Sequence, residues 1–365
     1  MNVYLARGRL LCLLVLSMLA NCSETGGDNG YYIVSPYTEQ TIEFFSQGRS
    51  LYHTTALETH QVGNRAYVLK EQSQTREIFL RQHTAESIPE KLVDGIVFTT
   101  LKLTSFSQVN PAILGKLLAA FGTISAQRLE VYNLDFADPG GVESLNTIET
   151  PAQRCILDIS SLRLLGTSEA AIRWLGLRID LSQCHINLLI DHMLVLKSLE
   201  MLDSFNALAV VGLWLYRFNR LDTMECKLFR EGPLPRVLSL RGYYPLTPTM
   251  SEQIRHSIIS AHWEELTISK EVFGELMMPG TEPRRLIADK LTVYAPHKMI
   301  GGDVSSTPFP AIGHNRVYTR FFRIYFSDSI NLVTSRELVR TIDWVSRYFR
   351  GLEWIILGLN SLWKK

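Results

Sequence analysis

The chain has 365 residues and a mass of 41.5 kDa, and its 37 lysines and arginines nearly balance its 36 aspartates and glutamates. This balance leaves no overall electrostatic field that would attract a nucleic acid or an anionic membrane. A hydrophobic fraction of 46% and a charged fraction of 20% are typical of a folded protein and exclude disorder over most of the chain.

Residues 1–22 have the order of charged, apolar and small residues that is typical of a secretory signal peptide. Arg7 and Arg9 precede an apolar run at 10–19, and Ala20 and Cys22 are the small residues at the expected cleavage site. The run is too short to span a bilayer, and no later apolar stretch is long enough. We therefore expect a secreted, extracellular protein without a transmembrane span, and a lipidated Cys22 as in bacterial lipoproteins is the alternative.

Residues 23–92 are predicted to form a flexible leader and an N-terminal capping region, because no leucine repeat can be drawn in them. Within this region we expect a strand at 66–69 and a helix at 74–83. A stack of repeats needs such an end piece, since its first turn would otherwise expose half of its core to water.

Residues 93–365 repeat an apolar-x-apolar pattern, which predicts one short strand in each copy. The last copy, 352–362, follows the template L-x-x-L-x-L-x-x-N-x-L most closely, with Asn360 at the asparagine position. Most copies lie about 28 residues apart, and two unequal steps around Leu175 indicate a displaced register there. The residues at the fourth template position are Leu101, Leu129, Leu157, Leu175, Val211, Leu238, Leu266, Leu291, Phe322 and Ile355.

Between the predicted strands the apolar period lengthens towards that of a helix. We expect helices at 111–121, 187–202, 251–262 and 335–349. Thr249 with Glu252, and Thr334 with Glu337, have the spacing of a capping box at the start of the last two helices. Repeats of one strand and one helix predict a parallel sheet with helices on one side, and the greater width of a helix bends such a stack into a horseshoe.

This pattern resembles the leucine-rich-repeat superfamily, specifically the helix-bearing repeats of the ribonuclease-inhibitor and F-box-associated type. With a signal peptide in front, the chain looks most like the secreted leucine-rich-repeat proteins of eukaryotic intracellular parasites. The template asparagine is present only as Asn360, and other residues replace it elsewhere. The resemblance implies an α/β solenoid of nine or ten irregular repeats, with a parallel concave sheet, convex helices and an N-terminal cap.

No sequence motif of a hydrolase, zinc protease, phosphate-binding loop or dithiol site is recognisable, so we expect no catalysis and no cofactor. His185 with His192, and His256 with His262, are too far apart on a helix for both members of a pair to ligate one zinc ion. Cys226 has no glycine turn beside it that would favour a nucleophile.

Three cysteines remain after the signal peptide, Cys155, Cys184 and Cys226. Cys155 and Cys184 lie about one repeat apart. A disulfide between neighbouring repeats and a set of three buried thiols are both compatible with this spacing.

A row of large side chains follows the second core residue of successive strands and is expected to point into the hollow of the horseshoe. Such residues are common at interface hot spots, because each offers a large area with a polar group. We therefore expect the chain to bind a protein partner, of unknown identity, through this concave face; the preference of aromatic residues for strands is the competing explanation. The predicted partner-binding residues are Tyr132, Arg178, Trp214, Arg241, Tyr294 and Tyr325.

The edge of the last repeat strand is expected to pair with another segment, because an uncovered strand presents unpaired backbone groups. A preceding segment, a second chain or solvent can cover it. Two other functions remain as alternatives to protein binding. One is a self-associating structural or surface component, and the other is a secreted hydrolase whose serine or cysteine nucleophile is not recognisable.

Overall fold

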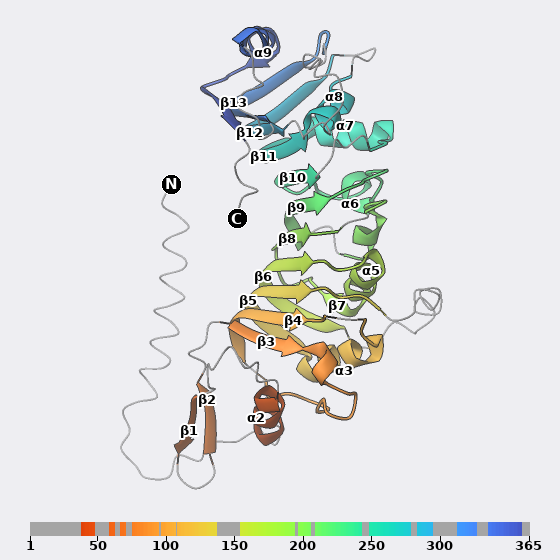
Figure 1. Cartoon of the computed structure of the whole chain (residues 1–365), viewed down its shortest axis with the longest axis vertical. Coiled ribbons are helices and arrows are strands. Elements are labelled where there is room, and N and C mark those ends of the chain that lie inside the picture. Colours follow the sequence, from red (N-terminus) through yellow and green to blue (C-terminus); the bar gives the residue numbers. More distant parts are fainter. Residues whose placement is uncertain are drawn as a thin grey trace.

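The computed structural model describes residues 38–47, 58–62, 66–70, 75–94, 96–106, 108–136, 154–193, 196–205, 209–242, 248–278, 283–294, 312–326 and 335–359. The expected signal peptide at 1–22, and Thr334 and Asn360, lie outside these ranges. Within them the chain is an α/β protein whose main element is a 13-stranded sheet. The strands are stacked along the long axis of the molecule, as Figure 1 shows.

All neighbouring strands of this sheet are parallel, as the alternation of strands and helices predicts. They follow one another in chain order, except that β7 and β8 both pair with β6, and β14 and β15 both pair with β13. The strands are β3 (Thr75–Phe79), β4 (Val97–Thr104), β5 (Thr123–Tyr132), β6 (Cys155–Leu165), β7 (Ile179–Asp180), β8 (Ile186–Asp191), β9 (Val210–Phe218), β10 (Val237–Gly242), β11 (His262–Ser269), β12 (Arg285–Tyr294), β13 (Arg316–Phe326), β14 (Phe349–Arg350) and β15 (Trp354–Leu359).

One apolar residue of each long strand from β4 to β15 lies in register with the next, and we call this set the apolar column. From β4 to β13 each member is at most 1% exposed. A second set, two residues further along the long strands from β4 to β13, is at most 2% exposed, so the same face of each of these strands faces the core. The apolar column consists of Leu101, Leu129, Leu162, Leu188, Leu213, Leu238, Leu266, Leu291, Phe322 and Ile355.

The predicted apolar column is confirmed except at Leu157, Leu175 and Val211. Leu157 lies on β6 but pairs with Ile124, five residues before the column position. Leu175 lies in helix α5 (Glu169–Arg178), whose apolar face imitates the strand pattern. Val211 is two residues before its column position on β9. The repeat at 157–211 is therefore more even than the sequence indicated.

Helices at 111–121, 251–262 and 335–349 are confirmed as α3 (Pro111–Phe121), α7 (Glu252–Ser260) and α9 (Ser335–Tyr348). The helices predicted at 74–83 and 187–202 are wrong. The first segment forms β3 and the 3-10 helix Leu80–Gln82, and the second contains most of β8 and the start of the 3-10 helix Glu200–Ser204. Short apolar runs such as these fit a buried strand as well as a helix, and only pairing with a neighbour decides between them.

The start of α7 also differs from its prediction, because Ser251 and not Thr249 is the N-cap. The Ser251 hydroxyl oxygen accepts a hydrogen bond of 3.3 Å from the Ile254 amide. The Thr249 hydroxyl donates to the carbonyl of Asp222 in the preceding repeat. Figure 1 shows α3, α5, α6 (Lys227–Arg230), α7 and α8 (Lys270–Leu276) on one side of the strand stack.

The same backbone conformation recurs at or just after the end of four consecutive long strands. Asn133, Gly166, His192 and Arg217, each four residues after its apolar-column residue, have φ values between 51° and 62°. Residues other than glycine rarely adopt this conformation. The amides of Asn133 and Gly166 donate to carbonyls of the next repeat, at 2.7 and 2.8 Å, so the turns stack as the strands do.

The segment before the sheet packs against its first repeats. Helix α2 (Thr38–Gln47) buries Phe44 and Phe45, and the ring of Phe45 lies 6.0 Å from that of Phe98 on β4. The Val93 amide donates to the Thr41 hydroxyl at 2.9 Å. Strands β1 (Glu58–Val62) and β2 (Ala66–Lys70), the second of which confirms the strand expected at 66–69, form a separate antiparallel pair.

Candidate interaction surface

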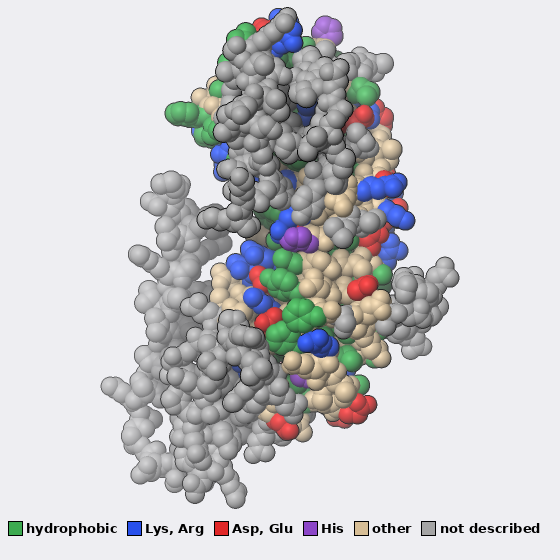
Figure 2. Space-filling model, in the orientation of Figure 1, with side chains coloured by type: hydrophobic (Ala, Val, Ile, Leu, Met, Phe, Trp, Pro, Cys, Tyr) green, Lys and Arg blue, Asp and Glu red, His purple; other side chains and the backbone are tan. Residues whose placement is uncertain are grey.

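The face of the sheet opposite the apolar column, which we call the outer face, is formed by the residues that alternate with the buried ones. Along β4 to β9 the small residues Thr100, Thr104, Ser161 and Gly212 lie among charged, aromatic, leucine and asparagine residues, and we call this second group the open section. Figure 2 shows hydrophobic, basic and acidic side chains mixed along the middle of the visible face, at the height of these strands in Figure 1. The open section comprises Lys102, Arg128, Glu130, Tyr132, Arg163, Leu165, Asn187, Leu189, Asp191, Trp214 and Tyr216, together with Arg217 near the end of β9.

Glu130 on β5 is the centre of a charge cluster that joins three strands. Its carboxylate lies 3.9 Å from the ammonium group of Lys102 on β4, 3.7 Å from the guanidinium of Arg128 and 3.5 Å from that of Arg163 on β6. The Tyr132 hydroxyl donates to it at 2.9 Å. Burial and this hydrogen bond raise the pKa of Tyr132 to about 12, so the phenol remains a donor at neutral pH.

The carboxylate of this cluster is buried, whereas the cations are partly exposed to solvent. The Glu130 side chain is 5% exposed, whereas those of Lys102, Arg128 and Arg163 are 31%, 39% and 37% exposed. A buried carboxylate needs such partners, because an unpaired charge is costly in a low dielectric. Solvent and any partner therefore meet mainly positive charge at this position.

A second pair repeats this arrangement two strands further along the sheet. Asp191 at the end of β8 is 3% exposed, and both of its oxygens accept hydrogen bonds from the guanidinium of Arg217, which is partly exposed. Asp191 also accepts a bond of 2.8 Å from the amide of His192. These contacts stabilise the left-handed backbone of His192 and Arg217.

Aromatic rings lie beside both charge groups, with Tyr132 on β5 and Trp214 and Tyr216 on β9. The indole of Trp214 lies over Gly212 on the same strand, so closely that a β-carbon at Gly212 would be 2.3 Å from the ring. The guanidinium of Arg241 lies 5.4 Å from the ring centre of Tyr216, and the ammonium of Lys102 lies 5.7 Å from that of Tyr132. Gly212 is a signal that the sequence contained, because glycine within a strand often marks a close approach.

The outer face of β10 to β12 is different, and we call its inaccessible residues the buried section. They are Ser239, Thr267, Ser269, Thr292 and Tyr294, and none is more than 6% exposed. Tyr294 accepts a hydrogen bond of 2.9 Å from the Gly242 amide, so its hydroxyl is used within the fold. These side chains are not available to a partner in this structure.

The six predicted partner-binding residues are therefore divided among several environments. Tyr132 and Trp214 lie in the open section, and Arg241 is beside it through its contact with Tyr216. Tyr294 belongs to the buried section, and Tyr325 is half-buried at the end of β13.

Arg178 is not on a strand, and its predicted place in the row is wrong. It ends helix α5 and lies 4.6 Å from the ring of Trp174. The same register error that placed Leu175 on a strand also placed Arg178 there. The open-section residues Arg163, Asp191 and Arg217 were missed for the related reason that their strands were assigned to the wrong register or to a helix.

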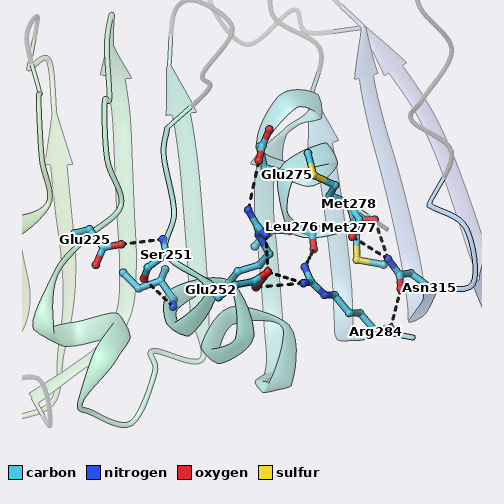
Figure 3. A network of polar contacts seen from close by, with 11 residues as sticks. Glu225, Ser251, Glu252, Glu275, Leu276, Met277, Met278, Arg284 and Asn315 are labelled. Carbon is cyan, nitrogen blue, oxygen red and sulfur yellow. Dashed lines mark hydrogen bonds and ion pairs between the residues drawn. The ribbon is translucent and has the colours of Figure 1, made fainter. Parts of the chain in front are cut away.

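A polar network on the helix side, drawn in Figure 3, connects α7, α8, β12 and the turn before β13. Arg284 contacts Glu252 at 3.0 Å and the carbonyl of Leu276 at 3.4 Å. Asn315, which is 2% exposed, accepts from the Arg284 amide and donates to the carbonyl of Met277, at 2.8 and 2.9 Å. An open cavity of about 640 Å³ lies beside Glu252 and Arg284. The side chains of Glu252, Arg284 and Asn315 are used in contacts between neighbouring repeats.

The cysteines and histidines do not form a reactive centre in the described ranges. All three cysteines are free, and burial raises the pKa of Cys155 and of Cys226 to about 12, so both are thiols at neutral pH. His185 and His192 stand at opposite ends of β8, and His262 lies 3.3 Å from Asp289. The described residues contain no group of three potential metal ligands.

Comparison with known proteins gives no relative, because no family model, curated protein or solved structure matches this chain. Among the helices that the structure describes, none combines the length and apolar character that crossing a membrane requires.

Proposed function

We propose that this chain is an exported solenoid of the leucine-rich-repeat type that binds a protein partner through the open section and catalyses no reaction. The observation that carries the proposal is the combination of partly exposed cations and aromatic rings above buried carboxylates. Arginine, tyrosine and tryptophan contribute most of the energy in protein interfaces. Their concentration on one face of a sheet supports binding more directly than any feature of the helix side.

The preference for a leucine-rich-repeat type rests on the spacing of the apolar column. Its members are 25 to 33 residues apart, which matches repeats that contain a strand and a helix. In this interpretation the open section is concave, the helices form the convex layer, and α2 belongs to the N-terminal cap. Leu134, Thr167, Met193 and Phe218 occupy the asparagine position of the template and are buried, whereas Phe106 at the same position is 61% exposed and Glu271 is half-buried.

Fixed side-chain geometry supports the proposal further. Glu130 holds Lys102, Arg128, Arg163 and Tyr132 in place, and Gly212 allows the indole of Trp214 to lie flat. Ordering a long side chain at an interface costs about 0.5–1.5 kcal/mol, so a surface ordered in advance loses less on binding. The exposed positive charge favours an acidic partner surface.

The test is a binding measurement with a purified partner. The chain is immobilised, a candidate is captured from extracellular fluid, and the dissociation constant of the purified candidate is measured for the wild type and for Trp214→Ala/Tyr216→Ala. We expect at least tenfold weaker binding for this variant, with an unchanged circular dichroism spectrum. The control is Arg173→Ala/Lys227→Ala, which removes exposed side chains of α5 and α6 on the helix side.

Weakening by the control variant alone, or no weakening by the double variant, would reject the open section as the binding site. Export is tested separately by N-terminal sequencing of the chain recovered from the medium. We expect Ser23 as the first residue; retention of the chain inside the cell would contradict the secreted interpretation.

A further inference from the structure

We propose that two copies of this chain associate through their β15 strands, antiparallel and about a two-fold axis, to form one continuous sheet. The site is independent of the open section and of the function proposed for it. It lies at the C-terminal end of the stack, where β15 pairs with β13 and with no other described strand.

The end of the stack exposes three consecutive large apolar side chains. Trp354, Ile355 and Ile356 are 63%, 39% and 43% exposed. Ile355 occupies the apolar column, whose other members from β4 to β13 are at most 1% exposed. A folded chain rarely leaves such a contiguous group in water, and an uncovered edge strand of this kind is a pairing site.

The helix layer is apolar at the same end. Helix α9 packs Trp344 against Phe273 of α8, with 5.7 Å between the ring centres. Val339 and Ile342 lie on the opposite side of α9 and are 65% and 50% exposed. Figure 1 shows α9 at the end of the stack beyond α8. The sheet and the helix layer therefore both present apolar side chains where a further repeat would stack.

The hydrogen-bond pattern of β15 restricts how a second strand can pair with it. The Glu353 amide donates to the Arg320 carbonyl of β13 at 2.9 Å. Backbone groups alternate in direction along a strand, so Ile355 also points its amide to β13, whereas Trp354, Ile356 and Gly358 point theirs to the free edge. Only registers that pair these three residues with one another complete the hydrogen bonds.

One such register is self-complementary in shape. With Ile356 opposite Ile356 of the second copy, each Trp354 lies opposite a Gly358, on the same face of the sheet. The missing side chain of glycine leaves room for the indole of the other copy. A two-fold axis also places the two α9 helices side by side, so that Val339 and Ile342 of both copies meet. These matches favour a second copy over an unrelated strand, and the formal net charge of +1 gives little repulsion between copies.

The first experiment is sedimentation equilibrium of the full chain at concentrations from about 1 to 100 μM, a range in which moderate interfaces dissociate. We expect a monomer–dimer equilibrium for the wild type and at least a tenfold larger dissociation constant for Ile356→Lys, which would place two ammonium groups beside the axis. The matched control is Ile287→Lys. Ile287 is 40% exposed, but its strand β12 has a neighbouring strand on each side and offers no free edge. This control is expected to dimerise as the wild type does.

The second experiment tests the register. Residues that form a hydrogen-bonded antiparallel pair have α-carbons about 5.5 Å apart, within disulfide range. We expect Ile356→Cys to form a disulfide-linked dimer on mild oxidation, and Ile287→Cys and the wild type not to form one. Gly358→Val is expected to weaken the dimer at least tenfold, because it fills the place of the indole.

A monomer throughout this concentration range would overturn the proposal, as would association that Ile356→Lys leaves unchanged. Association lost in Ile356→Lys without a crosslink in Ile356→Cys would also overturn it, because the strands would then meet in another way.

Discussion

The open section and the buried section occupy equivalent positions of one sheet, yet they differ in almost every physical property. Trp214 on β9 and Ser239 on β10 are direct neighbours in register, but the first is a partly exposed indole and the second is 1% exposed. In the open section charged and aromatic side chains form ion pairs, hydrogen bonds and cation–π contacts with one another, many of them between neighbouring strands. In the buried section side chains that carry a hydroxyl group, four of them small, are packed within the fold. A common register therefore gives residues a common direction without giving them a common role.

The largest expected effect is the loss of stability in Tyr294→Ala. Tyr294 is 5% exposed and its hydroxyl satisfies the Gly242 amide, so the substitution creates a cavity and an unpaired donor. We expect the free energy of unfolding to fall by about 3–5 kcal/mol in urea denaturation. Tyr325 pairs with Tyr294 in register and is only half-buried, so Tyr325→Ala is the matched control, with an expected loss of about 1 kcal/mol. Equal losses would remove the distinction between the buried and partly exposed positions.

The next effect is expected for Arg217→Ala in the open section. The substitution leaves the buried carboxylate of Asp191 with the His192 amide but without its guanidinium. We expect a loss of about 2–3 kcal/mol, which is less than the roughly 3–5 kcal/mol for a fully buried pair because Arg217 is partly exposed. Arg241→Ala, which removes a cation from the ring of Tyr216, is expected to cost about 0.5–1 kcal/mol. A larger loss for Arg241→Ala would show that ring stacking outweighs the buried carboxylate.

The charge cluster around Glu130 is expected to make stability depend on alkaline pH. Burial and the Glu130 carboxylate raise the pKa of Tyr132 to about 12 in the folded chain, above about 10 for an unfolded tyrosine. The contribution is therefore fully present below about pH 10 and is lost as the pH rises towards 12. Phenolate absorbance is expected to show this late titration step in the wild type, and Tyr132→Phe should lack it.

Glu130→Gln is expected to lower the pKa of Tyr132 while burial keeps it raised, since burial is the larger cause. Removal of the carboxylate also leaves three cations close together, and we expect it to reduce the free energy of unfolding by about 1–2 kcal/mol. A titration curve that is the same in both chains would show that the hydrogen bond between Tyr132 and Glu130 does not form.

The smallest effect is a gain in stability, expected for Thr267→Val in the buried section. The Thr267 hydroxyl is buried and has no hydrogen-bond partner among the described residues. A similarly shaped apolar side chain removes this penalty, and we expect a gain of up to about 1 kcal/mol. Thr104→Val provides the contrast, because the Thr104 hydroxyl donates to Glu77 at 2.7 Å, and it should lose about 1 kcal/mol. A loss in both variants would indicate that the Thr267 hydroxyl has a partner.

The repeat was predictable from the sequence because its apolar positions are periodic. Leu101, Leu129, Leu238, Leu266 and Leu291 could be placed in register from the sequence alone, and the parallel sheet follows from a strand and a connection in each repeat. The errors in register are confined to 157–211, where an apolar helix and two strands follow one another closely. Leu175 in α5 and Leu188 in β8 have similar local sequences, and neighbouring strands decide which of them joins the apolar column.

The interaction surface was predictable only in part, because large aromatic and basic side chains are visible in a sequence but their partners are not. Tyr132 and Trp214 were found at their correct strands. The role of Glu130 depends on Lys102 and Arg163, which come from different repeats and meet only across the sheet. The left-handed conformation of His192 and Arg217 has no signal in residue type, since glycine or asparagine would be expected there.

The sequence by itself determined that the chain forms a parallel α/β stack of repeats, because apolar periodicity is a local property that each repeat carries independently. Tertiary structure decided which outer-face positions remain accessible, which carboxylates are buried below cations, and that Ile355 at the last strand is exposed while its equivalents are not. The physical reason is that burial depends on what lies next to a side chain in space, and in a stack of repeats that neighbour is about 25 to 33 residues away in the chain.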